Sequence, residues 1–409
     1  MGLKKYKLAD IADFNKSSIS KSETFKEIIY LDTSSITENV VSGTVIMNTK
    51  EAPSRAQRKV TNNTIIYSTV RPRLKHYGIL SRPQNNFIVS TGFTTIDIKD
   101  LYKDKIDPRY LYLLLTQPTI TDYIGNIADT AVSAYPSINP SDLSSLCFMF
   151  PDYDIQKTIA DIWNNYDRKI ELNRAINQNL EAMAKQLYDY WFVQFDFPNE
   201  EGKPYKSSGG KMIWNEKLKR EIPNGWNNCT LQEFLTIKNG RDHKHLATGS
   251  HPVYGSGGEM RRVNEYLFSG ESVLMPRKGT LNNIMYVNES FWTVDTMFYS
   301  EMKIVHSAKY VFFAIKDIDF TKWNSGTGLP SMTASTLYNI SMIKPSDDLL
   351  KRFNDVLIPV FYKIKQTKDE CEKLIRQRDE LLPLLMNGQV SVNSDLSACI
   401  NLIIRTTAR

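Results

Sequence analysis

Two groups of polar loops hold the side chains of this sequence that are best suited to bind a polyanion. Arginine, lysine and asparagine side chains donate hydrogen bonds to phosphate oxygens and to the edges of nucleic-acid bases. In the first half of the sequence the candidates are Arg55, Arg58, Arg71, Arg73, Lys75 and His76. In the second half they are Arg241, Lys244, Tyr254, Ser256, Arg261, Arg277, Lys278 and Asn282. We interpret these loops as DNA-binding, although a solvated surface loop explains any single one equally well.

The placement of the loops favours DNA binding. The segment Val70-Arg71-Pro72-Arg73 follows the apolar run Ile65-Ile66-Tyr67. The segment Met275-Pro276-Arg277-Lys278 follows a Ser-Val-Leu run in the same way. Because both runs are typical of strands, cationic turns at their ends indicate a shared role in the two halves.

No motif in the sequence predicts catalysis. The sequence has no G-x-x-x-x-G-K-[ST] phosphate-binding loop and no Asn-Pro-Pro-Tyr-like tetrapeptide of an amino-methyltransferase. Residues 255–258 are glycine-rich but lack the full dinucleotide fingerprint. Asp152 followed by Asp167-Arg168-Lys169 is only superficially like a nuclease pattern, because Asp-x-Lys is frequent by chance. The histidines of residues 243–251 have no cysteine or acidic ligand at a fitting spacing, so we predict a polar loop without metal.

Length and composition set broad limits. With 409 residues the chain is long enough for two or three domains. A net charge of +6 permits a polyanionic partner without requiring one. The four isolated cysteines fit a reducing compartment: Cys147, Cys229, Cys371 and Cys399. No apolar run approaches the roughly 18 residues of a membrane span, and the first residues lack the apolar stretch of a signal peptide. We therefore expect a cytoplasmic protein with no membrane partner.

The polar loops need rigid elements to position them, and the sequence predicts an α+β fold. Short β-branched runs separated by Pro, Gly and Asn indicate β-rich domains, and apolar residues at 3/4 spacing indicate long helices. The predicted boundaries are 1–150 and 222–345 for the β-rich domains, 151–193 and 346–388 for the helical regions, 194–221 for a linker, and 389–409 for a C-terminal tail.

The second helical region repeats the first at an offset of 194 residues. Tyr135-Pro136-Ser137-Ile138 precedes one copy and Leu329-Pro330-Ser331-Met332 precedes the other. Pro151, Asp154, Lys157, Asp161 and Ile170 recur as Pro345, Asp348, Lys351, Asp355 and Ile364. Such a duplication predicts a pseudo-twofold molecule, which suits a target with two half-sites, and DNA is the commonest target of that kind. The alternative is an old duplication kept only for stability.

The long helices need a partner for their apolar stripes, and each repeat supplies one to the other. We expect antiparallel packing through Ile176, Leu180, Met183, Leu187, Leu374, Leu381 and Leu385, with Asn173 and Lys169 interrupting the stripe. Pro359 predicts a kink or a restart of the second helix, because proline lacks an N–H donor. Gly388 predicts its C-terminal cap.

These features together give the chain a strong resemblance to the specificity subunits of type I restriction–modification systems. In the first β-rich domain the resemblance lies in residues 52–56 and 68–72, and at the central junction in Phe195-Asp196-Phe197-Pro198 and Ile222-Pro223-Asn224-Gly225-Trp226. In the second domain it lies in residues 252–258, 276–280 and 292–296, and in the closing helix in residues 381–388. It covers nearly the whole chain except the tail after about Val392.

The resemblance implies two α/β target-recognition domains at opposite ends of two antiparallel spacer helices. It implies a bacterial, non-catalytic subunit that binds a bipartite double-stranded DNA target with an unread gap and needs no cofactor itself. Two modification subunits would bind S-adenosylmethionine and methylate adenine, and restriction subunits would use ATP and Mg²⁺ to cut. Phage DNA-mimic inhibitors are a further implied class of partner. The alternatives are the specificity half of a fused restriction–methylation enzyme and a two-domain scaffold that binds only proteins.

Overall fold

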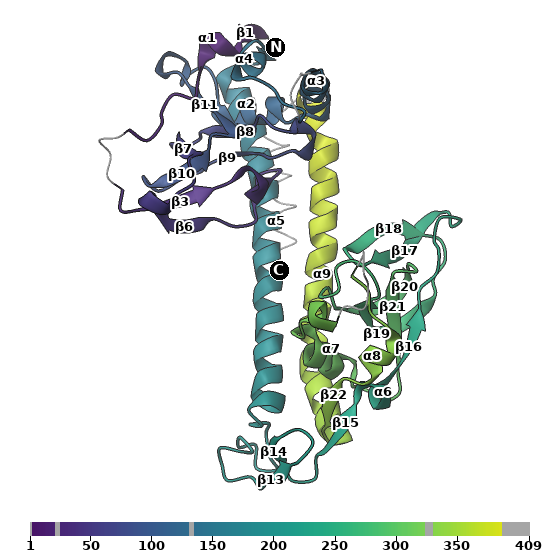
Figure 1. Cartoon of the computed structure of the whole chain (residues 1–409). Coiled ribbons are helices and arrows are strands. Elements are labelled where there is room, and N and C mark those ends of the chain that lie inside the picture. The colour runs from purple at the N-terminus through teal and green to yellow at the C-terminus, as the bar shows by residue number, and fades with distance from the viewer. Residues whose placement is uncertain (1, 21–24, 131–134, 324–329, 387–409) are drawn as a thin grey trace. The chain divides into compact units, whose positions relative to one another are not determined.

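The computed structural model describes residues 2–20, 25–130, 135–323 and 330–386, and its fold is the α+β class expected from the sequence (Figure 1). The chain divides into two compact units, Met1–Leu172 with Glu372–Arg409, and Asn173–Cys371. Each unit holds one β-rich domain and a part of each long helix, α5 (Tyr153–Tyr188) and α9 (Asp347–Met386). Within the described ranges no helix is long and apolar enough to cross a membrane.

The β-rich domain of the first unit combines small sheets with short helices. Two four-stranded sheets have the orders β6-β3-β10-β7 and β2-β11-β8-β9, and β1 pairs with β12 and β4 with β5. The strands are β1 (Lys4–Lys7), β2 (Ala12–Phe14), β3 (Glu27–Leu31), β4 (Ile36–Thr37), β5 (Val40–Val41), β6 (Val45–Asn48), β7 (Ala56–Lys59), β8 (Ile65–Ser68), β9 (Tyr77–Ile79), β10 (Phe87–Ser90), β11 (Phe93–Ile98) and β12 (Cys147–Phe150). The helices are α1 (Leu8–Ile11), α2 (Pro108–Leu115), α3 (Pro118–Asp129) and α4 (Pro140–Ser144).

Burial explains the central elements of this domain. All four residues of β8 are buried, as expected for a β-branched and aromatic run between two neighbouring strands. Helix α2 buries every residue from Tyr110 to Leu115, so it is a core helix without a polar face. It begins with Pro108 in its first turn, where the missing N–H costs nothing, and the Asp107 carboxylate caps it by accepting the Arg109 N–H (2.8 Å).

The β-rich domain of the second unit is built on one six-stranded sheet with the order β16-β21-β19-β20-β17-β18. The strands are β13 (Met212–Asn215), β14 (Arg220–Pro223), β15 (Asn227–Thr230), β16 (Leu235–Asn239), β17 (Thr248–Gly255), β18 (Gly258–Val263), β19 (Phe268–Pro276), β20 (Met285–Thr293), β21 (Met297–Met302) and β22 (Ser341–Lys344). The helices are α6 (Leu231–Phe234), α7 (Ala308–Lys316) and α8 (Ala334–Tyr338).

The segment expected to be a linker is packed into the second unit. Strand β13 pairs antiparallel with β14, and Phe197 is buried with its ring stacked on Trp226 at 5.2 Å. Phe195 meets the same indole edge-on at 5.6 Å. The turn-rich composition predicted a linker, and these aromatic side chains attach that segment to the core of the second unit.

The internal repeat is visible in the structure. Helices α4 and α8, strands β12 and β22, and the first residues of α5 and α9 are all separated by the offset of 194 residues. The sequence β1-α1-β2 of the first unit also recurs as β15-α6-β16, and β1–β12 and β15–β22 are both antiparallel pairs. The two units therefore share a chain path although their sheets differ in strand number.

Helix α9 does not restart at Pro359. It runs without a break from Asp347 to Met386, so the expected restart is wrong. Pro359 is exposed, whereas Leu357 and Ile364 on either side of it are buried. Their packing outweighs the roughly 3 kcal/mol that a proline costs inside a helix. The predicted cap Gly388 and the tail 389–409 lie outside the described residues.

The apolar face of α5 also differs from the expectation. Ile176 and Met183 are 42% and 52% exposed, and Leu180 and Leu187 are only half-buried. Asn173, Asn177 and Ala184 are the buried side chains of this part of α5. On α9, Leu374 and Leu385 are buried and Leu381 is half-buried.

Hydrogen bonds explain why polar residues take the buried face. In the second unit the Asn173 amide donates to the Glu370 carboxylate (2.8 Å), and the Asn177 amide donates to the Ile364 carbonyl (3.4 Å). The partner number falls as the α5 number rises, so the two helix segments of this unit are antiparallel. A buried amide is tolerated when it is hydrogen-bonded. The neighbouring apolar side chains Ile176 and Met183 are therefore exposed to solvent.

Candidate nucleic-acid interface

The cationic turn of the first unit follows β8 and is attached to the segment before α4. The Arg71 N–H donates to the Pro136 carbonyl (2.8 Å), and the Ile138 N–H donates to the Thr69 carbonyl (2.9 Å). Arg71 has a positive φ of 48°, which is uncommon for a residue with a Cβ. Its guanidinium lies 4.7 Å from the centre of the Tyr135 ring. Arg71 is exposed and forms no ion pair with the described part of the chain, so it is available to a ligand.

The other predicted residues of the first unit are held by partners within the protein. Arg73 bonds to three residues of α3, namely Asp122 (3.3 Å), Asn126 (2.7 Å) and Asp129 (3.1 Å). Lys75 pairs with Glu38 (2.5 Å) and Arg55 with Asp32 (3.1 Å). Arg58 donates to the Ser18 hydroxyl (3.4 Å), and His76 Nδ1 lies 2.6 Å from the Ile36 carbonyl. These contacts give Arg73, Lys75 and His76 a structural role in fixing the turn, whatever they also bind.

The cationic turn of the second unit has the same backbone bonds. The Gly279 N–H donates to the Pro330 carbonyl (3.1 Å), and the Met332 N–H donates to the Arg277 carbonyl (2.8 Å). Gly279 has a φ of 91°, a conformation that glycine adopts without strain. Arg277 and Lys278 are exposed, and the Arg277 guanidinium lies 6.0 Å from the centre of the Phe298 ring. Matching turns in both units were expected from the sequence, and the structure contains them.

The bridges of the two turns align them residue by residue. The isolated bridges pair Val70 with Ser137 and Lys278 with Ser331, two partners separated by the repeat offset. Val70 is therefore equivalent to Lys278, and Arg71 is equivalent to Gly279. From the sequence, the two segments are compared only as wholes, by the strand-like run that each one follows. The turns are equivalent but their cations are not.

Four other predicted residues of the second unit make internal contacts. Arg261 donates to His243 Nδ1 (3.1 Å) and to the Leu246 carbonyl (3.1 Å), which fixes the loop before β17. Arg241 accepts from the Trp292 indole through its carbonyl (2.9 Å). Asn282 donates to Asp319 (3.3 Å) and accepts the Phe320 N–H (2.8 Å). Tyr254 donates to Glu289 (2.8 Å), and burial is the main reason why the pKa of its phenol is raised.

A groove brings two of the predicted residues together with two carboxylates. Lys244 and Ser256 line it together with Asp242, Asp295 and Thr296, and its volume is about 640 Å³. The carbonyl of Thr296 accepts both the Arg277 N–H (2.8 Å) and the Lys278 N–H (3.2 Å), so the groove borders the cationic turn. The two aspartates were not among the residues predicted from the sequence, because those residues were chosen as donors to phosphates and bases.

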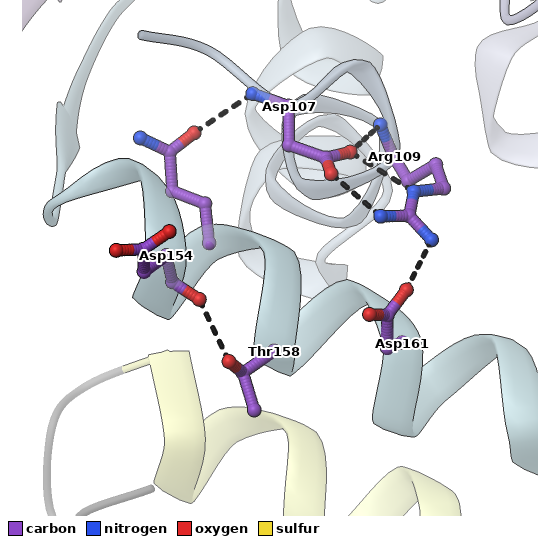
Figure 2. A network of polar contacts seen from close by, with 6 residues as sticks. Asp107, Arg109, Asp154, Thr158 and Asp161 are labelled. Carbon is purple, nitrogen blue, oxygen red and sulfur yellow. Dashed lines mark hydrogen bonds and ion pairs between the residues drawn. The ribbon is translucent and has the colours of Figure 1, made fainter. Parts of the chain in front are cut away.

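A cation, half-buried in the first unit and buried in the second, attaches each β-rich domain to the long helix of its own unit. In the first unit Arg109 bonds to Asp107 (2.6 Å) and to Asp161 of α5 (2.5 Å), as Figure 2 shows. The Gln156 side chain of α5 accepts the Asp107 N–H (3.0 Å). Hydrogen bonds from the Arg109 guanidinium, to Asp107 first, raise the pKa of Arg109. The ion pair therefore joins α2 to α5.

The second unit places Lys309 at the equivalent position, the second residue of α7. Lys309 is 2% exposed and bonds to Glu271 of β19 (2.5 Å) and to Asn354 of α9 (2.7 Å). The Tyr286 hydroxyl also donates to Glu271 (2.5 Å). Burial alone would raise the pKa of Glu271, but its bonds to Lys309 and Tyr286 hold that pKa below its ordinary value. Neither anchor was predicted, because each links residues far apart in the sequence.

Two β-rich domains, each with an exposed cationic turn and an anchored long helix, define a duplicated α+β binding protein. The chain belongs to the family described as type I restriction modification DNA specificity domain, whose model matches residues 2–182 and 223–372. That family is the one that the sequence resembled.

Three similar proteins illustrate the relationship. The HindI specificity subunit of Haemophilus influenzae is 23% identical and covers 95% of this chain and 99% of the relative. The MjaIX specificity subunit of Methanocaldococcus jannaschii is 24% identical over 83% of each chain. The crystal structure of the S subunit from M. genitalium has a TM-score of 0.59 at 18% identity and covers 94% of this chain and 96% of that one. At this identity the structural likeness shows the fold.

Proposed function

We propose that this chain is the subunit that selects the DNA target of a type I restriction–modification complex, and that each β-rich domain reads one half of a bipartite target. The pair of cationic turns with the same backbone bonds carries the proposal. Membership in the specificity family makes double-stranded DNA the ligand to test first. Between the half-sites we expect base pairs that no residue of this chain reads.

The chemistry of the complex is assigned to partner subunits. The sequence contains no phosphate-binding loop and no amino-methyltransferase tetrapeptide. Adenine methylation with S-adenosylmethionine would thus belong to two modification subunits, and ATP- and Mg²⁺-dependent cleavage to restriction subunits. This chain would contribute the choice of sequence and no catalytic group.

A selection experiment tests this function directly. The full chain, purified with its modification subunits, is incubated with a library of randomised DNA duplexes, and the bound duplexes are sequenced. We expect two short conserved half-sites separated by a gap of constant length and random sequence. Enrichment of no sequence, with the protein assembly intact, would instead favour a scaffold that binds only proteins.

The same material tests the turns. Removing a phosphate contact lowers the affinity for every sequence, whereas removing a base contact relaxes the preference at one position of the target. We assign DNA contact to Arg71, Arg277 and Lys278 first, because these three lie on the two equivalent turns, are exposed and have no ion-pair partner in the described ranges.

A further inference from the structure

The groove beside the second cationic turn contains an exposed carboxylate, Asp295, which could bind a ligand. Asp295 lies between β20 and β21 and lines the groove. It is exposed, and its carboxylate forms no hydrogen bond or ion pair with the residues that the structure describes. The next residue, Thr296, accepts the N–H groups of Arg277 and Lys278. A negative charge therefore lies one residue from the backbone that supports two cations expected to bind DNA.

Close backbone packing holds this part of the groove in place. A Cβ atom added at Gly240 would lie 2.0 Å from the Val294 carbonyl oxygen, directly before Asp295. A Cβ atom at Gly279 would lie 2.6 Å from the Ser256 hydroxyl, so the turn also approaches the groove wall closely. The Val294 N–H donates to the Tyr254 carbonyl (3.0 Å). Asp295 is thus presented from a fixed backbone, which a specific contact requires.

The chemistry of a carboxylate restricts what it can bind on DNA. It repels phosphates, and when ionised it only accepts hydrogen bonds. In the major groove, guanine and thymine present acceptors at their carbonyl oxygens, whereas cytosine N4 and adenine N6 present amino donors. A carboxylate that faces the major groove of bound DNA therefore favours cytosine or adenine and rejects guanine and thymine.

We propose that Asp295 is a specificity-determining residue that accepts a hydrogen bond from the exocyclic amino group of one cytosine or adenine. This inference rests on the proposed function, because it assumes that the second unit reads DNA. Lys244 and Ser256, which line the same groove, would accompany this contact.

The first unit has different chemistry at the equivalent place. The Thr69 N–H donates to the Gly92 carbonyl (2.9 Å) as the Arg277 N–H donates to the Thr296 carbonyl (2.8 Å). This register makes Thr91 the counterpart of Asp295. A neutral hydroxyl both donates and accepts, so the amino-group requirement belongs to the half-site of the second unit alone.

The test compares Asp295→Asn and Asp295→Ala with the unchanged chain, each purified with its modification subunits. Library selection first gives the target of the unchanged chain. Duplexes are then made in which each candidate base in turn lacks its amino group, with purine replacing adenine and pyrimidin-2-one replacing cytosine. The two replacements distinguish the two bases. Exchange of residues 223–328 identifies the half-site that belongs to the second unit.

We expect the unchanged chain to lose roughly 5- to 150-fold in affinity at one such position, the fold-change of a good base contact. The two Asp295 variants should differ at that position and nowhere else: Asp295→Ala, which has no acceptor, loses the discrimination, whereas Asp295→Asn keeps an accepting oxygen, gains a donor and loses only the rejection of guanine and thymine. They should also bind non-specific duplex more tightly, because a charge that repels phosphate has been removed. This gain in non-specific affinity is opposite in sign to the effect of removing a cation.

Glu301→Gln is the matched control, since Glu301 lies at the other end of β21 and pairs with Lys238 (3.5 Å). It removes the same charge and should leave the sequence preference unchanged. Asp242→Asn tests the other carboxylate of the groove. The inference is overturned if Asp295→Ala keeps the full sequence preference, if it loses affinity equally for all sequences, or if only Asp242→Asn relaxes a position. Failure of the unchanged chain to select any sequence would refute the proposed function instead.

Discussion

Replacing Lys309 with methionine tests whether one buried cation anchors the second β-rich domain to α9. The Lys309 side chain is 2% exposed, and its ammonium bonds to Glu271 (2.5 Å) and Asn354 (2.7 Å). Methionine has a similar shape but no charge, so it fills the space and leaves the Glu271 carboxylate without its cation. The Tyr286 hydroxyl would remain its only strong partner among the contacts seen here.

The expected loss of stability follows from this geometry. Breaking a buried ion pair by removing one partner costs about 3–5 kcal/mol. The Glu271 side chain is 28% exposed, so water reaches it and we expect the lower end of that range. In a unit of about 200 residues, 3 kcal/mol lowers the melting temperature by roughly 6–12 °C.

Scanning calorimetry of the full chain measures this shift, and Lys316→Met is the control. Lys316 ends the same helix, is 35% exposed and lies 3.9 Å from Glu181, so its loss should cost less than about 1 kcal/mol. Adding Glu271→Gln to Lys309→Met should recover part of the loss, because no buried charge then lacks a partner. Equal melting temperatures for the Lys309 and Lys316 variants would refute the anchoring role.

The pH dependence has a definite sign. The pKa of Glu271 is lower in the folded protein than its ordinary value, so its contribution is present at neutral pH and is lost as the pH falls through the folded pKa. The stability difference between the unchanged chain and Lys309→Met should therefore shrink in acid.

Three further predictions concern DNA binding and the helices. Arg71→Ala should weaken binding to all duplexes and reduce the salt slope by about one if Arg71 contacts phosphate. Arg73→Ala should mainly lower the melting temperature, because Arg73 is held by Asp122 and Asp129. If the Arg71 variant binds as the unchanged chain does at several salt concentrations, Arg71 does not contact DNA. Exchanging residues 223–328 for the second domain of another family member should change one half of the selected target, and a change in both halves would contradict independent reading. Asn177→Leu should be neutral or stabilising by about 1 kcal/mol in thermal unfolding, because the side-chain carbonyl oxygen of Asn177 is buried without a hydrogen-bond partner. A clear loss of stability would show that the hydrogen bond from the Asn177 amide to the Ile364 carbonyl stabilises the fold.

The sequence predicted the elements that are encoded locally. The repeat offset predicted two equivalent long helices, and α5 and α9 do begin at equivalent residues, because each copy keeps its own short-range pattern. The short repeated elements α4, α8, β12 and β22 were not predicted. The sequence also did not locate the buried face of α5. Hydrophobic periodicity favoured Ile176 and Met183, whereas Asn173 and Asn177 occupy the buried face through hydrogen bonds to α9. Hydrophobic periodicity cannot predict these hydrogen bonds, because they join residues that are far apart in the sequence.

The candidate DNA-binding residues likewise depend on contacts that the sequence does not show. Cationic side chains could be found by type, but whether a cation is available to a ligand depends on acids that are distant in the sequence. Arg73 and Arg71 look alike in the sequence, yet α3 holds the first and leaves the second exposed. Asp295 was overlooked because its significance comes from the backbone bonds between Thr296 and the cationic turn.

The two anchors suggest how the domains can diverge in what they bind while keeping their attachment. Arg109 and Lys309 stand at the same position of α2 and α7, and each reaches the long helix of its own unit. Their partners differ, since one is a carboxylate of α5 and the other an amide of α9. Both attachments use residues outside the cationic turns and outside the groove. A change at the turn or in the groove, such as Gly279 at the position of Arg71 or Asp295 at the position of Thr91, therefore alters the surface that we propose for DNA contact without breaking the bonds that hold the domain to its helix.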